Sequence, residues 1–112
     1  MKVKSKVWLE KRNGLILGEG KAQLLKEIDR SGSINKAAQS MGVSFRKAWS
    51  SVTAVEKRLG ARLIERQKGG SNGGGSLLTP SARTLIRKYD RLKQSVDRFA
   101  DKKFKEIFHG GI

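Results

Sequence analysis

The stretch from residue 33 to residue 59 constrains the fold more than any other part of the chain. It contains two short helical patterns separated by Gly42, a residue that favours the left-handed backbone found at helix ends. Ser33 and Ser44 stand where the capping hydroxyl of each helix is expected. Two helices joined by so tight a turn predict a helix–turn–helix. The apolar positions of the second pattern recur at three- and four-residue spacing and are expected to face the core: Phe45, Ala48, Trp49, Val52, Val55 and Leu59.

The opposite face of the second helical pattern is short-stemmed or cationic, with no carboxylate before Glu56. Such a face suits the reading of base edges in a DNA groove, because it brings no negative charge toward the phosphates. We therefore predict base contacts from Arg46, Lys47 and Ser50, with Arg46 able to pair with guanine O6 and N7. An ordinary helical hairpin with a solvated basic face is the alternative.

The 112-residue chain carries a formal net charge of +15, and this charge is unevenly distributed. Residues 44–70 contain seven basic side chains against two acidic ones, whereas residues 19–43 contain four against three. A polyanionic partner explains such an excess. Double-stranded DNA is favoured over a membrane surface, because no apolar run approaches the ~18 residues of a membrane span. Phosphate contacts are predicted from Ser44, Ser51, Lys57, Arg58, Arg62, Arg66 and Lys68.

The composition argues against an enzyme. The chain has no cysteine, which excludes a thiolate metal site and a disulfide, and its one histidine, His109, is isolated and is not expected to supply a metal cluster or a catalytic triad. We therefore predict no catalytic residue, no metal and no cofactor. No secretory apolar segment follows Met1, so the protein is expected in the cytoplasm.

The N-terminal third predicts a β-hairpin followed by a helix. Residues 3–10 alternate apolar and polar side chains, as in a half-buried strand. Arg12-Asn13-Gly14 is a strong hairpin signal, and residues 15–17 would form the returning strand. Residues 21–30 carry an apolar stripe at helical spacing. The hairpin is either part of the core or only a lid on it.

A second hairpin pattern follows the helix–turn–helix. Residues 62–67 resemble a strand, five glycines occupy residues 69–75, and residues 77–79 would return. This order predicts a winged helix, with the wing at about residues 67–76 contacting DNA through backbone amides and a few cations. A connector without function is the alternative. A Walker A phosphate loop is excluded, because the glycine segment lacks the required lysine.

The C-terminal part predicts one long helix. Pro80 suits its first turn with Thr79 as the cap, and the pattern runs without a breaker over residues 82–108. Such a helix is too long to bury its apolar stripe within so small a core, so we predict a homodimer formed through it. The alternative is that it folds back onto the first helix. Residues 1–79 would then form the DNA-binding domain and residues 80–109 the dimerisation helix. The predicted interface positions are Leu85, Tyr89, Leu92, Val96 and Phe99.

Two segments, SGSINKAAQSMGVSFRKAW and LIERQKGGSNGGGSLLTPSA, resemble the DNA-binding domain of the ModE-type molybdate-responsive regulators. The resemblance covers about residues 20–100, and residues 55–66 are also similar to LysR-type regulators. It implies a mainly α fold with small β elements, a winged helix–turn–helix that dimerises through long helices and acts at promoters. By the family's pattern, the helix at residues 44–59 would enter the major groove.

One departure from the family pattern changes the functional expectation. ModE-type regulators that sense molybdate carry C-terminal oxyanion-binding domains, and this sequence reaches Ile112 without such a module. The expectation is a stand-alone DNA reader, or one that works with a separate effector-binding protein. The predicted function is therefore a sequence-specific transcriptional regulator that binds promoter DNA as a homodimer. A sequence-neutral architectural DNA-binding protein is the alternative.

Overall fold

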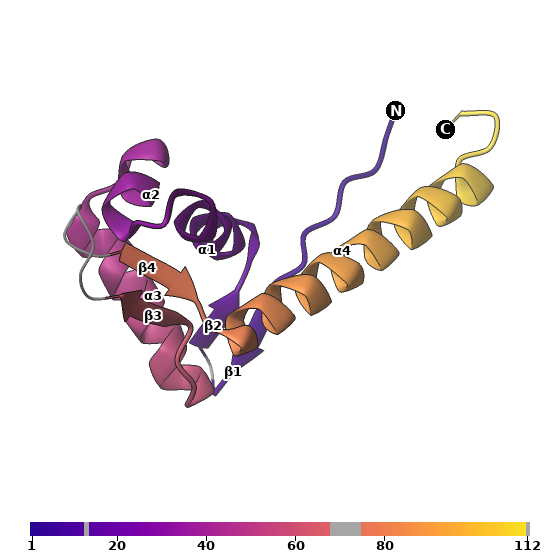
Figure 1. The fold of residues 1–112 in the computed structure, drawn as a ribbon. Helices are drawn as coiled ribbons and strands as arrows, with labels where there is room; N and C mark the ends of the chain where they lie inside the picture. Colours follow the sequence, from indigo (N-terminus) through magenta and orange to yellow (C-terminus); the bar gives the residue numbers. More distant parts are fainter. Residues whose placement is uncertain (13, 68–74, 112) are drawn as a thin grey trace.

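The structure is a computed structural model that describes residues 1–12, 14–67 and 75–111. It confirms a mainly helical fold with two small antiparallel hairpins and a long C-terminal helix (Figure 1). The elements in chain order are β1 (Leu9–Lys11), β2 (Gly14–Leu17), α1 (Glu19–Ser31), α2 (Ile34–Ser40), α3 (Phe45–Leu59), β3 (Ile64–Gln67), β4 (Gly75–Leu78) and α4 (Pro80–Ile107).

The helix boundaries follow the local signals in the sequence. The Ser33 hydroxyl accepts a hydrogen bond from the Lys36 N–H at 3.1 Å, so it caps α2. The Ser44 hydroxyl caps α3 in the same way, at 3.1 Å from the backbone nitrogen of Lys47. Gly42, with a φ of 69°, adopts the left-handed backbone that the turn between α2 and α3 requires.

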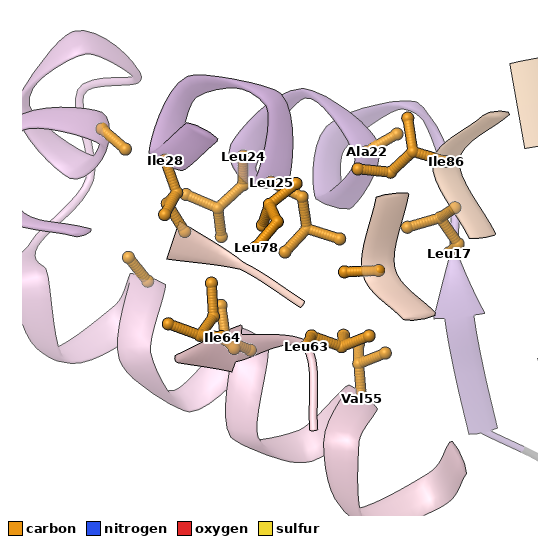
Figure 2. Packing of buried hydrophobic residues seen from close by; sticks show 14 of the residues in the cluster. Leu17, Ala22, Leu24, Leu25, Ile28, Val55, Leu63, Ile64, Leu78 and Ile86 are labelled. Atoms are coloured by element: carbon orange, nitrogen blue, oxygen red, sulfur yellow. The ribbon is translucent and has the colours of Figure 1, made fainter. Parts of the chain in front are cut away.

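The core lies between α1 on one side and α3 on the other, with β3 and β4 between them (Figure 2). Leu24, Leu25 and Ile28 of α1 face Leu78 of β4, and Val55 of α3 lies on the far side of the cluster (Figure 2). Because apolar side chains from every layer meet there, the second hairpin is part of the packed core rather than an appendage.

The β3–β4 hairpin is held against the α1–α2 corner by a close backbone approach. The Ser76 N–H donates to the Gly32 carbonyl at 2.8 Å. A Cβ added at Gly75 would lie 2.8 Å from the same carbonyl oxygen. Any residue other than glycine at position 75 would therefore require one of the two backbone segments to move.

A carboxylate at the end of α3 organises the turn into β3. Glu56 accepts hydrogen bonds from the backbone nitrogens of Leu63, at 2.8 Å, and Ile64, at 3.4 Å. The Thr79 hydroxyl completes this junction by donating to the Arg62 carbonyl at 2.7 Å. The carboxylate of α3 thus serves the fold and does not face outward with the cations.

The N-terminal hairpin belongs to the core, because Ile16 and Leu17 of β2 are buried there. Its turn is shifted by one residue from the sequence signal: Lys11 pairs with Gly14, and Arg12 has a φ of 54°. Asn13 lies outside the described residues. The prediction of a strand from residue 3 is wrong, because pairing in the described chain starts only at Leu9.

Residues 1–8 instead run beside α4 as an extended segment (Figure 1). The Ser5 hydroxyl donates to Asp97 at 2.7 Å, and the Tyr89 hydroxyl donates to the Val7 carbonyl at 2.8 Å. The Ser5 hydrogen bond and the Lys93 ammonium lower the pKa of Asp97. The N-terminal segment therefore occupies one side of α4.

The first half of α4 packs on the core, which corrects part of the predicted dimer interface. Tyr89 is only 2% exposed within one chain, and Leu85 is half-buried against the core cluster. Ion pairs of 3.0 Å (Lys26–Asp90) and 2.8 Å (Arg83–Asp29) join α4 to α1. A third ion pair, Lys93–Glu19 at 3.2 Å, is the last of these toward the C-terminus. The packing against α1 given above as the alternative thus occurs in the first half of α4 alone, and the distal part of the helix projects away from the core (Figure 1).

Replacing Glu56 by alanine should lower the free energy of unfolding by about 1–3 kcal/mol, because two backbone N–H groups lose a charged acceptor. Glu56→Gln retains a carbonyl oxygen and should lose less. Urea denaturation at a fixed protein concentration measures both changes. Glu65→Ala, at an exposed position on β3, is the control. Equal effects of Glu56→Ala and Glu65→Ala would contradict the role of the Glu56 carboxylate.

Candidate nucleic-acid interface

The orientation of α3 is determined by its buried face. Ala48, Val52 and Val55 are 1–2% exposed and lie in the core cluster. Side chains on the other face point to solvent, as the periodicity predicts. The exposed residues include Arg46, Lys47, Ser50 and Lys57.

The structure corrects one position on this helix. Phe45 was expected in the core-facing stripe, but it is 47% exposed. It is the first residue of α3, directly after the cap Ser44, and is not among the residues packed against the core cluster, whereas Ala48 is buried in it. Periodicity identifies a direction around the helix axis but not whether a neighbour is present along the axis, so this position was misassigned.

Trp49 connects α3 to the second hairpin. Its ring is half-buried against the core cluster, which partly confirms the predicted core-facing position. The guanidinium of Arg66 on β3 lies over the ring, 4.4 Å from its centroid. A cation over an indole face is attracted by the ring quadrupole, worth about 0.5–1 kcal/mol at an exposed site. Arg66 is therefore placed beside the helix by a contact within the fold.

Two residues predicted to contact phosphates have other surroundings. Arg58 donates from Nη1 to the Leu15 carbonyl at 2.6 Å and lies across Gly14, where a Cβ would overlap its guanidinium. Ser51 is half-buried and lines the small gap between α1 and α3 beside Lys21. Burial lowers the pKa of Lys21, and the nearby Arg58 cation lowers it further. Arg58 and Ser51 therefore lie on the side of α3 that packs against other elements.

The other predicted phosphate contacts differ in what the structure describes. Lys57, Arg62 and Arg66 are exposed, and Ser44 is an exposed hydroxyl that also caps α3. Lys68 and the other residues of the predicted wing from 69 to 74 lie outside the described residues. The described cations are thus distributed along α3, on the connection that follows it and on β3.

The part of the chain that the structure describes offers neither a metal-ion site nor a membrane-spanning helix. Residues 1–12, 14–67 and 75–111 contain no group of three or more His, Cys, Asp or Glu side chains placed to hold a metal ion. None of the helices within these ranges combines the length and the apolar character needed to cross a bilayer.

Residues 21–83, from the first helix through the start of α4, match the model of the family described as bacterial regulatory helix-turn-helix protein, lysR family. The chain belongs to this family. The membership agrees with the geometry, because the matched residues include both helices of the helix–turn–helix and the β3–β4 hairpin. It also confirms the prediction that the chain is not an enzyme, since the family is one of regulatory proteins.

Relatives of known name are similar over the same region. A transcriptional regulator ModE of Haemophilus influenzae is 40% identical over 84 residues, which are 75% of this chain and 33% of that protein. The molybdenum-pterin-binding protein MopB of Rhodobacter capsulatus is 38% identical over 85 residues, 76% of this chain and 32% of MopB. These matches confirm the resemblance to ModE-type regulators. The chain spans about a third of the length of these relatives.

Two solved structures confirm the fold class. The DNA-binding domain of CbnR, solved in complex with DNA, has a TM-score of 0.58 at 19% identity and covers 79% of this chain and 95% of that one. The DNA-binding domain of BenM, solved with the benA site 1 DNA, has a TM-score of 0.57 at 20% identity, over 81% and 96% of the two chains. At these identities the likeness shows the shared winged-helix fold.

Sequence reasoning assigned Arg58 and Arg66 to the same role, and the structure separates them. The Arg58 guanidinium binds a backbone carbonyl of the N-terminal hairpin, and the Arg66 guanidinium stacks on Trp49. Gly14 was a sequence signal for the Arg58 contact, since a glycine within a strand often marks a close approach by another group. We find no sequence signal for the stacking of Arg66.

Arg66→Gln should destabilise the fold by about 0.5–1 kcal/mol and change the environment of the Trp49 ring. Trp49 emission can be measured alone in a Trp8→Phe background, because the chain has two tryptophans. Arg62→Gln removes the same charge from a nearby exposed position and should leave the emission unchanged. Identical spectra for the two variants would contradict the stacking.

Proposed function

We propose that the chain binds double-stranded DNA as a sequence-specific transcriptional regulator, with α3 in the major groove. One observation carries this proposal: Arg46, Lys47 and Ser50 point outward from a helix whose opposite face is buried in the core. A helix held in this way presents the same side chains to every base pair it meets, as direct readout requires. Regulation of promoters would place the protein in the cytoplasm.

The charges around α3 support DNA as the partner. The first turn of α3 contains no acidic residue, and Lys57 and Arg58 stand in its last turn. In the proposed complex, phosphates are contacted by Ser44, Lys57, Arg62 and Arg66, and by Lys68 from the wing. Arg58 and Ser51 are left out of this set, because each lies on the packed side of α3.

We further propose that two copies pair through the projecting part of α4. Leu92 is 44% exposed and Phe99 62% exposed, and Val96 lies between them on the same helical face. A neighbouring groove of about 450 Å³ is lined by Leu59, Leu63 and Leu85, among others. A second copy would cover this apolar surface, and a symmetric dimer would read half-sites about 34 Å apart or a multiple of that distance. Tyr89 is excluded from the interface because its own chain buries it.

Arg46→Ala should relax base preference at one position of the site, at a cost of about 1–3 kcal/mol in binding. Lys57→Ala removes a proposed phosphate contact and should weaken all sequences equally. Mobility-shift titrations with duplexes selected from a random library measure the affinity of each variant and its base preference. If a dimer neutralises ~6–10 phosphates, affinity should fall by roughly 10³–10⁵ between about 50 and 200 mM salt. Uniform weakening by Arg46→Ala would favour the sequence-neutral architectural protein.

Leu92→Asp, alone and together with Val96→Asp, should produce monomers and a large loss of affinity for a two-half-site duplex. The reason is that each change places a charge in an apolar contact between copies. Sedimentation velocity measures the oligomeric state. Gln94→Asp adds the same charge at an exposed position on another face of α4 and should remain dimeric. Unchanged sedimentation of the double variant would place the interface elsewhere.

A further inference from the structure

Phe45 is an exposed aromatic side chain at the N-terminal edge of the proposed DNA-reading surface. At 47% exposure it leaves much of its ring in water, although Ala48, one turn further along α3, is 1% exposed. A single exposed apolar side chain is ordinary on a protein surface, so Phe45 is distinguished by its place at the start of α3, beside two exposed cations, rather than by its exposure alone.

The surroundings of Phe45 indicate what covers it. The ring stands on the first residue of α3, between the cap Ser44 and the exposed cations Arg46 and Lys47. A protein partner would require a larger apolar patch than one side chain, and it would have to accept two adjacent positive charges. The occupant must therefore be polyanionic and must offer one small apolar group.

Thymine in duplex DNA meets both requirements. Its C5-methyl is the apolar group that a base pair presents in the major groove, and phenylalanine is one of the side chains suited to contact it. A phenyl ring carries no hydrogen-bonding group, so it can recognise a base there only through such a contact. A neighbouring arginine would read guanine by hydrogen bonds, so adjacent residues of one helix turn would read different bases.

We propose that Phe45 determines specificity by packing its ring against the 5-methyl group of a thymine in each half-site. This inference rests on the proposed function, because it requires α3 to lie in the major groove. The inference specifies which base is recognised, namely thymine. It assigns that recognition to Phe45, which helical periodicity had predicted to lie in the core.

The experiment removes one methyl group at a time from the DNA. A high-affinity duplex is selected from a random library with the full chain, and each thymine is replaced singly by deoxyuridine, which keeps the hydrogen bonds to adenine. Wild-type protein should lose about fourfold in affinity at one thymine per half-site, the effect expected for one buried methyl group. The other substitutions should change binding little. Fluorescence anisotropy at constant salt gives the dissociation constants.

Variants of the protein then test whether Phe45 is responsible. Phe45→Ala should bind the thymine and deoxyuridine duplexes equally, whereas Phe45→Leu should retain part of the difference. Trp8→Ala removes another exposed aromatic ring, from the N-terminal segment and away from both α3 and the proposed dimer interface, and should retain the whole difference. Circular dichroism of each variant establishes that it is folded.

Two outcomes would overturn the inference while the proposed function stands: a selected duplex with no methyl-sensitive thymine, or a fourfold difference that persists in Phe45→Ala. The second result would mean that the ring has only a structural role. If the library yields no preferred sequence at all, sequence-specific binding fails and the inference fails with it. That result is recognised at the selection step, before any deoxyuridine is introduced.

Discussion

The packing of α3 against the core through Ala48, Val52 and Val55 controls the rest of the surface. Small and β-branched side chains let the helix approach its neighbours closely, and a close-packed contact of this kind resists rotation about the helix axis. At the C-terminal end of α3, Glu56 ties the helix to the backbone that leads into β3. Near its N-terminal end, the stacking of Arg66 on Trp49 ties it to the same strand. The outward face is therefore presented in one orientation, and the second hairpin is held at a defined position beside it.

The long helix divides its length between two kinds of contact. Its first half completes the core with Ala82, Ile86 and Tyr89, and its second half projects with an apolar stripe exposed. The extended N-terminal segment lies on one side of α4 through Ser5 and Val7, while Leu92 and Phe99 stay exposed. Because the helix is continuous from the core to its distal end, a contact made by the distal part would fix the distance between two DNA-reading surfaces. A 28-residue helix is about 42 Å long, comparable to one turn of DNA.

Cations that look equivalent in the sequence have different surroundings in the fold. Arg46 and Lys47 extend into solvent at the start of α3, Arg58 binds a backbone carbonyl, and Lys21 is partly desolvated beside it. A net charge predicts that a polyanion is attracted, since the field adds over all cations. It does not predict which cations touch that polyanion, because this depends on neighbours contributed by other elements.

The sequence by itself determined the features that depend on local interactions. The caps at Ser33, Ser44 and Thr79, the left-handed Gly42 and the helical periods all act over a few residues, and the structure has each of them. Tertiary structure alone decided the exposure of Phe45 and the burial of Tyr89. Both side chains lie on an apolar stripe, and the spacing of a stripe indicates only the direction in which a side chain points around the helix axis. Whether that direction meets protein or water depends on segments distant in the chain, such as the N-terminal segment whose Val7 carbonyl accepts a hydrogen bond from Tyr89.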